Sequence, residues 1–161
     1  MPFPISLCTL RSQPNARASI LAAATPNKEV MIAADLGTAS WACIHFLEES
    51  KLGPLTQQLQ SMDLKAEEIG IPPISSAEDL FRQIARAFEF PAYVGDNWDA
   101  LEEALRDLEW LPATGYTLVV RQARHTWADC PEVAGLLAEV WLTAAEWWAG
   151  SGTPFHLIFG L

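Results

Sequence analysis

Short apolar runs alternate with helical stripes of apolar residues along the second half of the chain. Residues 116–120 and 155–159 are apolar runs rich in β-branched and aromatic side chains, which is typical of strands. Residues 133–148 instead carry apolar side chains at helical spacing and stop at Gly150-Ser-Gly152. Strands that alternate with helices favour an α/β fold with a small, mainly parallel sheet and helices packed on it.

Two further helices are predicted upstream of these elements. Ser76 precedes an acid by three residues and then a helical stripe, so it is expected to cap a helix that ends before Pro91. A second helix is expected over about 97–108. The stretch after the strand at 116–120, up to Pro131, is expected to be a loop that includes His125.

The pattern is weaker in the first half. Residues 41–47 are apolar and aromatic and are followed by two acids, which predicts a strand. Gly53-Pro54 is expected to open a helix over 55–62, with the proline in its first turn. A second short strand is expected near 62–65, and Ile71-Pro-Pro is a break.

The N-terminal residues 1–27 contain four prolines and little periodicity. They indicate an extension or a loosely packed arm in front of a single domain over 28–161. Residues 5–10 alternate between apolar and polar side chains, so an edge strand is the other interpretation of part of this arm.

Acidic residues outnumber basic ones by 20 to 10, which gives a formal net charge of −10. Such a field repels phosphate backbones and anionic membranes and attracts basic partners. Nucleic-acid and membrane binding are therefore not expected, whereas a basic protein partner is allowed. Solubility alone is the other interpretation of the charge.

No motif for a cofactor, a metal site or a catalytic centre is present. The three cysteines form no C-x-x-C pair: Cys8, Cys43 and Cys130. The three histidines are isolated from one another in the sequence: His45 and His156 are expected to be structural or exposed, and the role of His125, in a predicted loop, stays open. Because no catalytic constellation is found, enzymatic activity is not expected. The chain also lacks a long apolar run and a good secretory signal, which favours a cytoplasmic protein.

The most informative segment is FPAYVGDNWDALEEAL, residues 90–105. Gly95 permits a turn that a side chain would hinder, and Asn97 is a good helix N-cap, with Asp96 as the competing candidate. The apolar residues of the predicted helix share one face: Trp98, Leu101, Leu105 and Leu108.

Carboxylates gather on the opposite face of the same helix. Asp99, Glu103 and Asp107 fall four residues apart, and Glu102 lies beside them. Like charges at this spacing cost about 0.2–0.5 kcal/mol per pair, and Arg106 offsets only part of that cost. The face is either an ordinary solvated surface or a binding surface for a basic partner.

The motif Phe-Pro-x-Tyr-x-Gly-x-Asn-Trp-Asp-Ala-Leu, here residues 90–101, resembles the signature segment of the barstar family. The helix before it, the strand after it and the last helix and strand also match, so the resemblance covers roughly residue 74 to the C-terminus. It implies a barstar-like α/β fold and an intracellular inhibitor of a basic ribonuclease, as in a toxin–immunity pair. It implies no cofactor, no metal and no catalytic residue.

The resemblance assigns eight partner-binding residues: Tyr93, Val94, Gly95, Asn97, Asp99, Glu102, Glu103 and Glu146. Asp99 matches an acid that enters the nuclease site. Glu103 stands where the family prototype has the aspartate with the largest share of binding. Glu102 replaces a tryptophan, and Val94 replaces an aromatic residue.

These departures favour a different target and leave a second function open. In that alternative, the chain is a barstar-like module that binds a protein other than a ribonuclease. The oligomeric state also stays open: Trp141 and Trp148 share a helix face and are expected in the core, whereas Trp147 points elsewhere and is a candidate for self-association.

Overall fold

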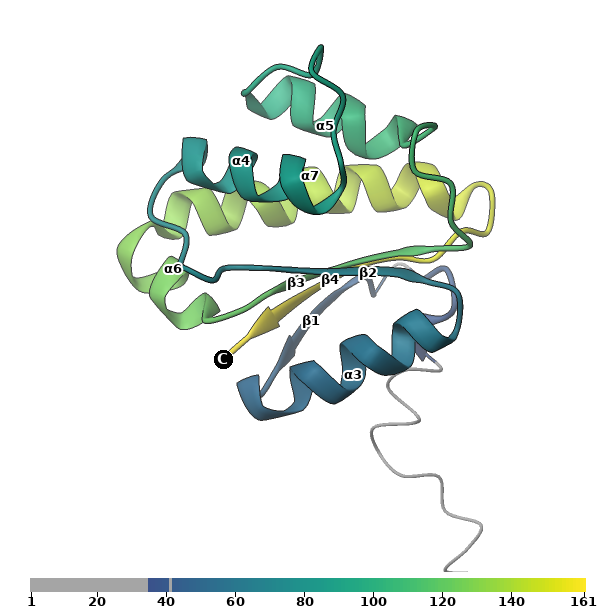
Figure 1. Cartoon of the computed structure of the whole chain (residues 1–161), viewed down its shortest axis with the longest axis horizontal. Coiled ribbons are helices and arrows are strands. Elements are labelled where there is room, and N and C mark those ends of the chain that lie inside the picture. Colours follow the sequence, from purple (N-terminus) through teal and green to yellow (C-terminus); the bar gives the residue numbers. More distant parts are fainter. Residues whose placement is uncertain (1–34, 41) are drawn as a thin grey trace, which may run out of the picture.

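The computed structural model describes residues 35–40 and 42–161, which form three layers around one sheet (Figure 1). The elements in chain order are β1 (Ile44–Leu47), α3 (Glu49–Ser61), β2 (Lys65–Ile69), α4 (Ala77–Ala87), α5 (Trp98–Asp107), β3 (Tyr116–Val120), α6 (Ala123–Asp129), α7 (Pro131–Ala149) and β4 (Phe155–Gly160). The predicted arm over 1–27, with its candidate strand at 5–10, lies outside the described residues, so the division into arm and domain stays a prediction.

The four strands are all parallel and lie in the order β1-β4-β3-β2. Leu118 in the middle of β3 pairs with Leu157 on one side and Glu67 on the other. Parallel neighbours need crossover connections, and each connection here contains at least one helix. The α/β fold with a parallel sheet that the sequence predicts is confirmed.

Helices cover both faces of the sheet: α4, α5 and α7 lie above it in Figure 1, α3 lies below it, and α6 lies beside its left-hand end. Leu118 and Leu157 belong to the core on the first side, and Val119 and Ile158 to the core on the α3 side. All residues of β3 and β4 are therefore buried. Burial on both faces explains why these strands are continuous apolar runs.

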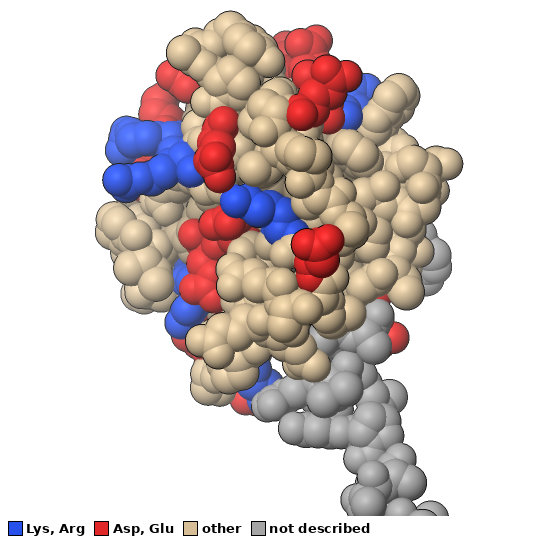
Figure 2. Space-filling model, turned by 45° about the vertical axis from the view of Figure 1, so that its right-hand side comes forward, with Lys and Arg blue, Asp and Glu red and all other residues tan. Residues whose placement is uncertain are grey.

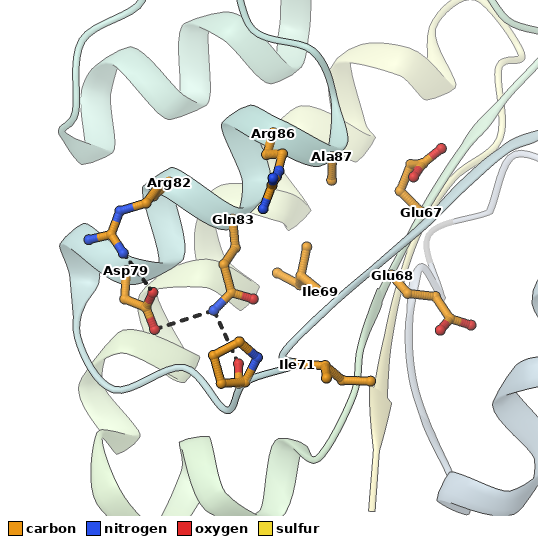
Figure 3. A pocket seen from close by; sticks show the side chains of 10 residues that line it. Glu67, Glu68, Ile69, Ile71, Asp79, Arg82, Gln83, Arg86 and Ala87 are labelled. Carbon is orange, nitrogen blue, oxygen red and sulfur yellow. Dashed lines mark hydrogen bonds and ion pairs between the residues drawn. The ribbon is translucent and has the colours of Figure 1, made fainter.

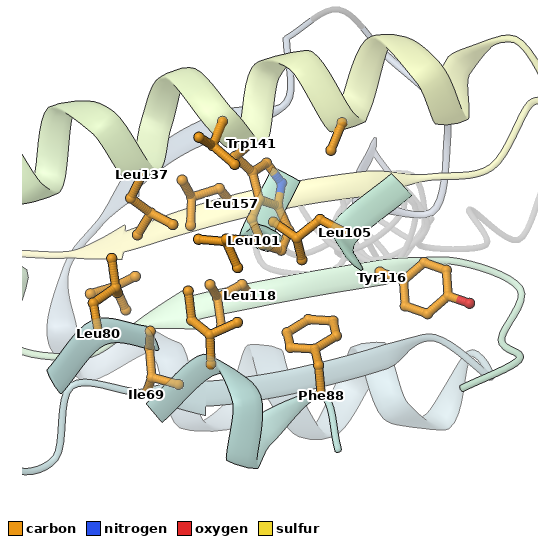
Figure 4. Packing of buried hydrophobic residues seen from close by; sticks show 14 of the residues in the cluster. Ile69, Leu80, Phe88, Leu101, Leu105, Tyr116, Leu118, Leu137, Trp141 and Leu157 are labelled. Atoms are coloured by element: carbon orange, nitrogen blue, oxygen red, sulfur yellow. The ribbon is translucent and has the colours of Figure 1, made fainter. Parts of the chain in front are cut away.

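Trp141 of α7 lies in the middle of the larger core and has no exposed surface (Figure 4). Its ring stacks on Phe155 of β4 with centroids 4.4 Å apart, and Phe88 meets it edge-on at 6.1 Å. These contacts fix α7 on the sheet. Because α5 then packs on α7, they also fix the height of α5 above the sheet.

Helix α3 begins at Glu49, so the prediction that Gly53-Pro54 opens it is wrong. Leu52 is fully buried with Leu55 and Leu59, and this stripe extends the helix backwards through the Gly-Pro pair. Pro54 sits inside the helix at an exposed position, where water can bond the carbonyl group that its missing N–H leaves free.

Two strand boundaries and one helix also differ from the predictions. The strand expected near 62–65 lies at Lys65–Ile69, and the strand expected over 41–47 is described as Ile44–Leu47. The expected loop up to Pro131 contains α6, whose Trp127 packs edge-on against Phe159 at 5.4 Å. A seven-residue helix has a weak local signal, and it forms here because its inner side chains are buried.

An ion network at the carboxyl end of the sheet joins α3, β2 and the residue after β3. Arg121 donates through Nε to Glu49 and through Nη1 to Glu68 at 2.8 Å. The other oxygens of these carboxylates accept hydrogen bonds from the backbone N–H of Gln122 at 3.0 Å and from the hydroxyl of Thr56 at 2.6 Å. The network thus ties α3 to two strands.

Arg121→Met is expected to lower the free energy of unfolding by about 1–2 kcal/mol, because two carboxylates lose their shared cation. The loss stays below that of a fully buried pair because the side chains of Arg121, Glu49 and Glu68 are 22%, 34% and 28% exposed. Urea unfolding measures it. The control is Arg82→Met, which removes a pair with Asp79 whose arginine side chain is 74% exposed, and it should change stability by less than about 0.5 kcal/mol. Equal losses in both variants would contradict the prediction.

Candidate functional site

Helix α5 is fixed at both ends by local interactions. The side-chain oxygen of Asn97 accepts a hydrogen bond from the N–H of Ala100 at 2.9 Å, so Asn97 is the N-cap and Asp96 is not. The helix ends at Leu108, which takes the left-handed conformation with φ 45°. The helix therefore has a defined start, length and rotation.

The inner face of α5 determines which side chains point outward. Leu101 and Leu105 are buried, and the carbonyl of Leu105 accepts a hydrogen bond from Nε1 of Trp148 on α7 at 2.8 Å. Trp98 packs edge-on against Phe81 of α4, with ring centroids 4.9 Å apart. The apolar face that the sequence predicts is therefore held by two neighbouring helices.

The outer face of α5 presents the predicted carboxylates to solvent. Asp99, Glu103 and Asp107 are exposed, and none of them forms an ion pair within the described residues. Glu102 is half-buried and pairs with Arg106 at 3.4 Å. The one cation on this helix is thus engaged beside the row of three acids rather than within it.

The loop before α5 places an aromatic side chain next to these acids. Tyr93 is 78% exposed, and the N–H of Val94 donates to the carbonyl of Pro91 at 3.0 Å. A Cβ at Gly95 would lie 3.1 Å from the side-chain nitrogen of Asn97, so glycine lets the loop lie close to the helix start. Loop and helix enclose a hollow of about 170 Å³, whose lining includes Tyr93, Val94, Gly95, Glu103, Asp107 and Trp110.

Helix α7 adds residues at the other side of α5. Glu146 is exposed but lines neither of the hollows next to α5. Its neighbour Trp147 is 63% exposed and lines a second hollow together with Glu103, Arg106 and Asp107. Neither Asp107 nor Trp147 was among the eight predicted residues. Helical spacing places Trp147 off the core face, but only the fold shows that it lies beside α5.

The exposed surface of α5 is mainly acidic, whereas the side of the molecule around β2 and α4 carries both acidic and basic side chains. Figure 2 shows carboxylate groups toward the top of the molecule, at the height of α5, and mixed acidic and basic groups lower down. In the mixed region Lys65 pairs with Glu67 at 3.1 Å and with Glu89 at 3.2 Å. Most charges there are neutralised locally, whereas the acids of α5 are largely not.

A larger hollow of about 420 Å³ lies between β2 and α4 (Figure 3). Gln83 crosses it: its amide donates to the carbonyl of Pro72 and to Asp79, and accepts from the N–H of Gly70 at 2.7 Å. Asp79 also pairs with Arg82. The lining contains no Ser, Thr, Cys, Lys or His, so it offers no nucleophile with a neighbouring base.

The histidines form no catalytic group within the described residues. His45 and His156 contact each other on the α3 side of the sheet, 3.1 Å apart, and burial lowers the pKa of both. His125 is exposed on α6. In the same part of the chain, no cluster of three His, Cys, Asp or Glu side chains suits a metal ion, and no helix is long and apolar enough to span a membrane.

Residues 65–160 match the family described as Barstar (barnase inhibitor). The match begins at the first residue of β2 and ends at the last residue of β4, so it contains the whole of α5 and the loop before it, whereas β1 and α3 precede it. No curated protein matches the chain. Since the match covers more than half of the chain and agrees with the parallel sheet and the motif at 90–101, this protein belongs to the barstar family.

Proposed function

We propose that this protein inhibits a basic ribonuclease by covering its active site with α5 and the loop before it. The observation that carries the proposal is the exposure of Asp99 and Glu103 on one face of α5, free of ion pairs in the described structure and beside the exposed Tyr93. The proposed partner-binding residues are Tyr93, Val94, Gly95, Asn97, Asp99, Glu102, Glu103 and Glu146.

The chemistry of the target explains why carboxylates suit this role. A ribonuclease holds a phosphodiester with arginine, lysine and histidine side chains. Carboxylates on a helix can take the place of phosphate oxygens and accept charge-assisted hydrogen bonds from those groups. Because Asp99 and Glu103 have no internal ion pair to break in the described structure, binding costs only their hydration.

The rigidity of the face also favours binding. Asn97 caps α5, and Trp148 ties it to α7, so the helix that carries the carboxylates is held in place before the partner arrives. A surface that is already ordered loses less conformational entropy on association. The repulsion among the acids is a small cost in folding free energy that a basic partner relieves.

The proposed activity makes and breaks no covalent bond, so it requires no catalytic residue, metal or cofactor. It fits the inhibitors after which the family is described. An immunity-type inhibitor acts where its toxin would otherwise cleave RNA, so we place this protein in the cytoplasm. The net charge of −10 would speed its encounter with a basic nuclease.

The test is a titration of small basic ribonucleases and ribonuclease-toxin domains with the purified protein, measured by calorimetry and by RNA cleavage. We expect at least one nuclease to be inhibited with one-to-one stoichiometry. Affinity should fall about tenfold or more between low and moderate salt, because screening weakens attraction between exposed charges.

Failure to inhibit any nuclease of the panel would overturn the ribonuclease assignment. In that case the alternative, a barstar-like module with another basic protein partner, is tested by affinity capture from the native cell. A captured basic protein that is not a ribonuclease and that high salt releases would support that alternative.

A further inference from the structure

Trp147 is an exposed tryptophan in a fixed position. The next residue, Trp148, donates its Nε1–H to the carbonyl of Leu105 at 2.8 Å and stacks on Phe155 with an interplanar angle of 15°. These contacts hold the end of α7 against α5. Because successive residues of a helix point about 100° apart, Trp147 is directed away from that core, and 63% of its surface stays exposed.

The indole of Trp147 shares a hollow with acids of the proposed binding face. The hollow measures about 290 Å³ and is lined by Trp147, Glu103, Arg106 and Asp107. Glu103 and Asp107 also line the hollow on the Tyr93 side. Two carboxylates therefore lie between two exposed aromatic side chains, one from the loop and one from α7.

The charge of this hollow favours a cationic occupant. Arg106 pairs with Glu102 at 3.4 Å, which leaves Glu103 and Asp107 without a cation within the described residues. Tryptophan has the aromatic face that attracts cations most strongly. A cation in this hollow would thus meet an indole and two carboxylates together.

We infer that this hollow binds an arginine side chain of the partner, with the guanidinium stacked on Trp147 and paired with Glu103 or Asp107. The inference rests on the proposed inhibition of a basic ribonuclease. Arginine fits better than lysine, because its planar, weakly hydrated group can stack on a ring and donate in its own plane to carboxylates. Trp147 thereby helps to determine specificity, although it is not one of the eight predicted partner-binding residues.

Three variants test the stacking against the inhibited nuclease. Trp147→Leu keeps an apolar side chain but has no aromatic face, and we expect about tenfold weaker binding; Trp147→Phe keeps a weaker face and should lose about threefold. The control is Leu142→Ala, a residue of α7 that is 42% exposed and lines neither hollow, which should stay within about twofold of wild type. Wild-type affinity in Trp147→Leu would overturn the inference.

A second measurement needs no nuclease, so it separates this inference from the proposed function. We expect N-acetyl-arginine amide to shift the NMR signal of the Trp147 indole N–H. The shift should fall to less than about half in the variant Glu103→Gln, Asp107→Asn, which removes the carboxylates but keeps their size. An equal shift in that variant would overturn the inference.

Sedimentation tests the other possible occupant of the hollow. If the wild type forms a dimer that Trp147→Leu dissociates, the inference is overturned, because the indole would then bind a second copy of this chain.

Discussion

Replacing Asp99 and Glu103 together by alanine is expected to weaken binding of the target ribonuclease by about 100- to 10,000-fold. Each carboxylate accepts hydrogen bonds from charged groups in the proposed complex, and such bonds contribute about 1.5–3 kcal/mol each. The two losses add to about 3–6 kcal/mol if the sites are independent, at about 1.4 kcal/mol per factor of ten. Calorimetry at moderate salt measures the change.

The same double variant should fold as stably as the wild type, to within about 1 kcal/mol. Alanine at 99 removes a favourable interaction between an acid and the first turn of α5, worth about 0.3–1 kcal/mol. Alanine at 103 relieves repulsion between acids four residues apart and has a higher helix propensity, which offsets part of that loss. A urea midpoint close to that of the wild type would therefore assign the lost affinity to the binding face.

The matched control removes the same two charges far from α5. Asp129 and Glu132 are exposed where α6 meets α7, at the opposite end of α7 from Trp147. Asp129→Ala, Glu132→Ala should lower affinity by no more than about fivefold, and this difference should vanish at high salt. A loss in the control as large as that in the test variant would show that net charge, not the α5 face, governs binding.

The departures from the family prototype have a structural counterpart. Glu102 stands where the resemblance places a tryptophan, and it pairs with Arg106 instead of offering an apolar contact. An exposed indole is present nonetheless, at Trp147 on α7, and it faces Glu103 and Asp107. In the proposed complex, the aromatic contact on this face would thus come from a different helix, which fits a target different from that of the prototype.

Local sequence signals predicted the part of the site that lies within one element. The N-cap at Asn97 and the division of α5 into an apolar and an acidic face need only interactions within a few residues, and both are observed. The neighbour of Glu103 on α7 is Trp147, which lies more than forty positions later in the chain. No local pattern encodes that contact, because it arises from the packing of α7 on α5.

The same distinction explains the errors in the fold. The predicted start of α3 is wrong because proline and glycine are strong local helix breakers, whereas burial of Leu52 in the smaller core outweighs their effect. Helix α6 was missed because its stability comes from tertiary contacts such as that of Trp127 with Phe159. The strands β3 and β4 were found because burial on both faces leaves a continuous apolar run.

The histidine pair on the α3 side of the sheet is a second contact between distant residues, and the tautomers of the neutral rings follow from their hydrogen bonds. His156 Nε2 lies 2.8 Å from the carbonyl of Thr38, which can only accept, so this nitrogen carries the proton. In a neutral ring, Nδ1 of His156 then accepts from Nε2–H of His45 at 3.1 Å. Burial lowers the pKa of both imidazoles, so both are neutral in the folded protein at neutral pH.

Lowering the pH from 7.5 to 5 is expected to reduce the free energy of unfolding by about 1–2 kcal/mol, because His45 is only partly buried and solvent screens part of the effect. Burial and the neighbouring His156 lower the pKa of His45 from 6.5 to about 4, although Asp35 acts in the opposite direction. Above pH 6.5 the ring is neutral in both states, so no stability is lost there. Below pH 6.5 the unfolded chain binds a proton that the folded protein does not, and stability falls until about pH 4, by about 1.4 kcal/mol per unit. Burial also lowers the pKa of His156, which adds to the loss.

Urea unfolding of the wild type, His45→Gln and His125→Gln at pH 7.5 and 5 measures this effect. His45→Gln should show a much smaller pH dependence, because it removes the group whose pKa changes most on folding. His125 is exposed on α6, so His125→Gln should behave as the wild type does. Since the pair joins β1 to β4 and to the segment before β1, amide exchange at pH 5 should increase first in β1. If the free energy of unfolding of the wild type is the same at both pH values, the prediction is contradicted, because the folded protein would then bind protons on these rings as readily as the unfolded chain does.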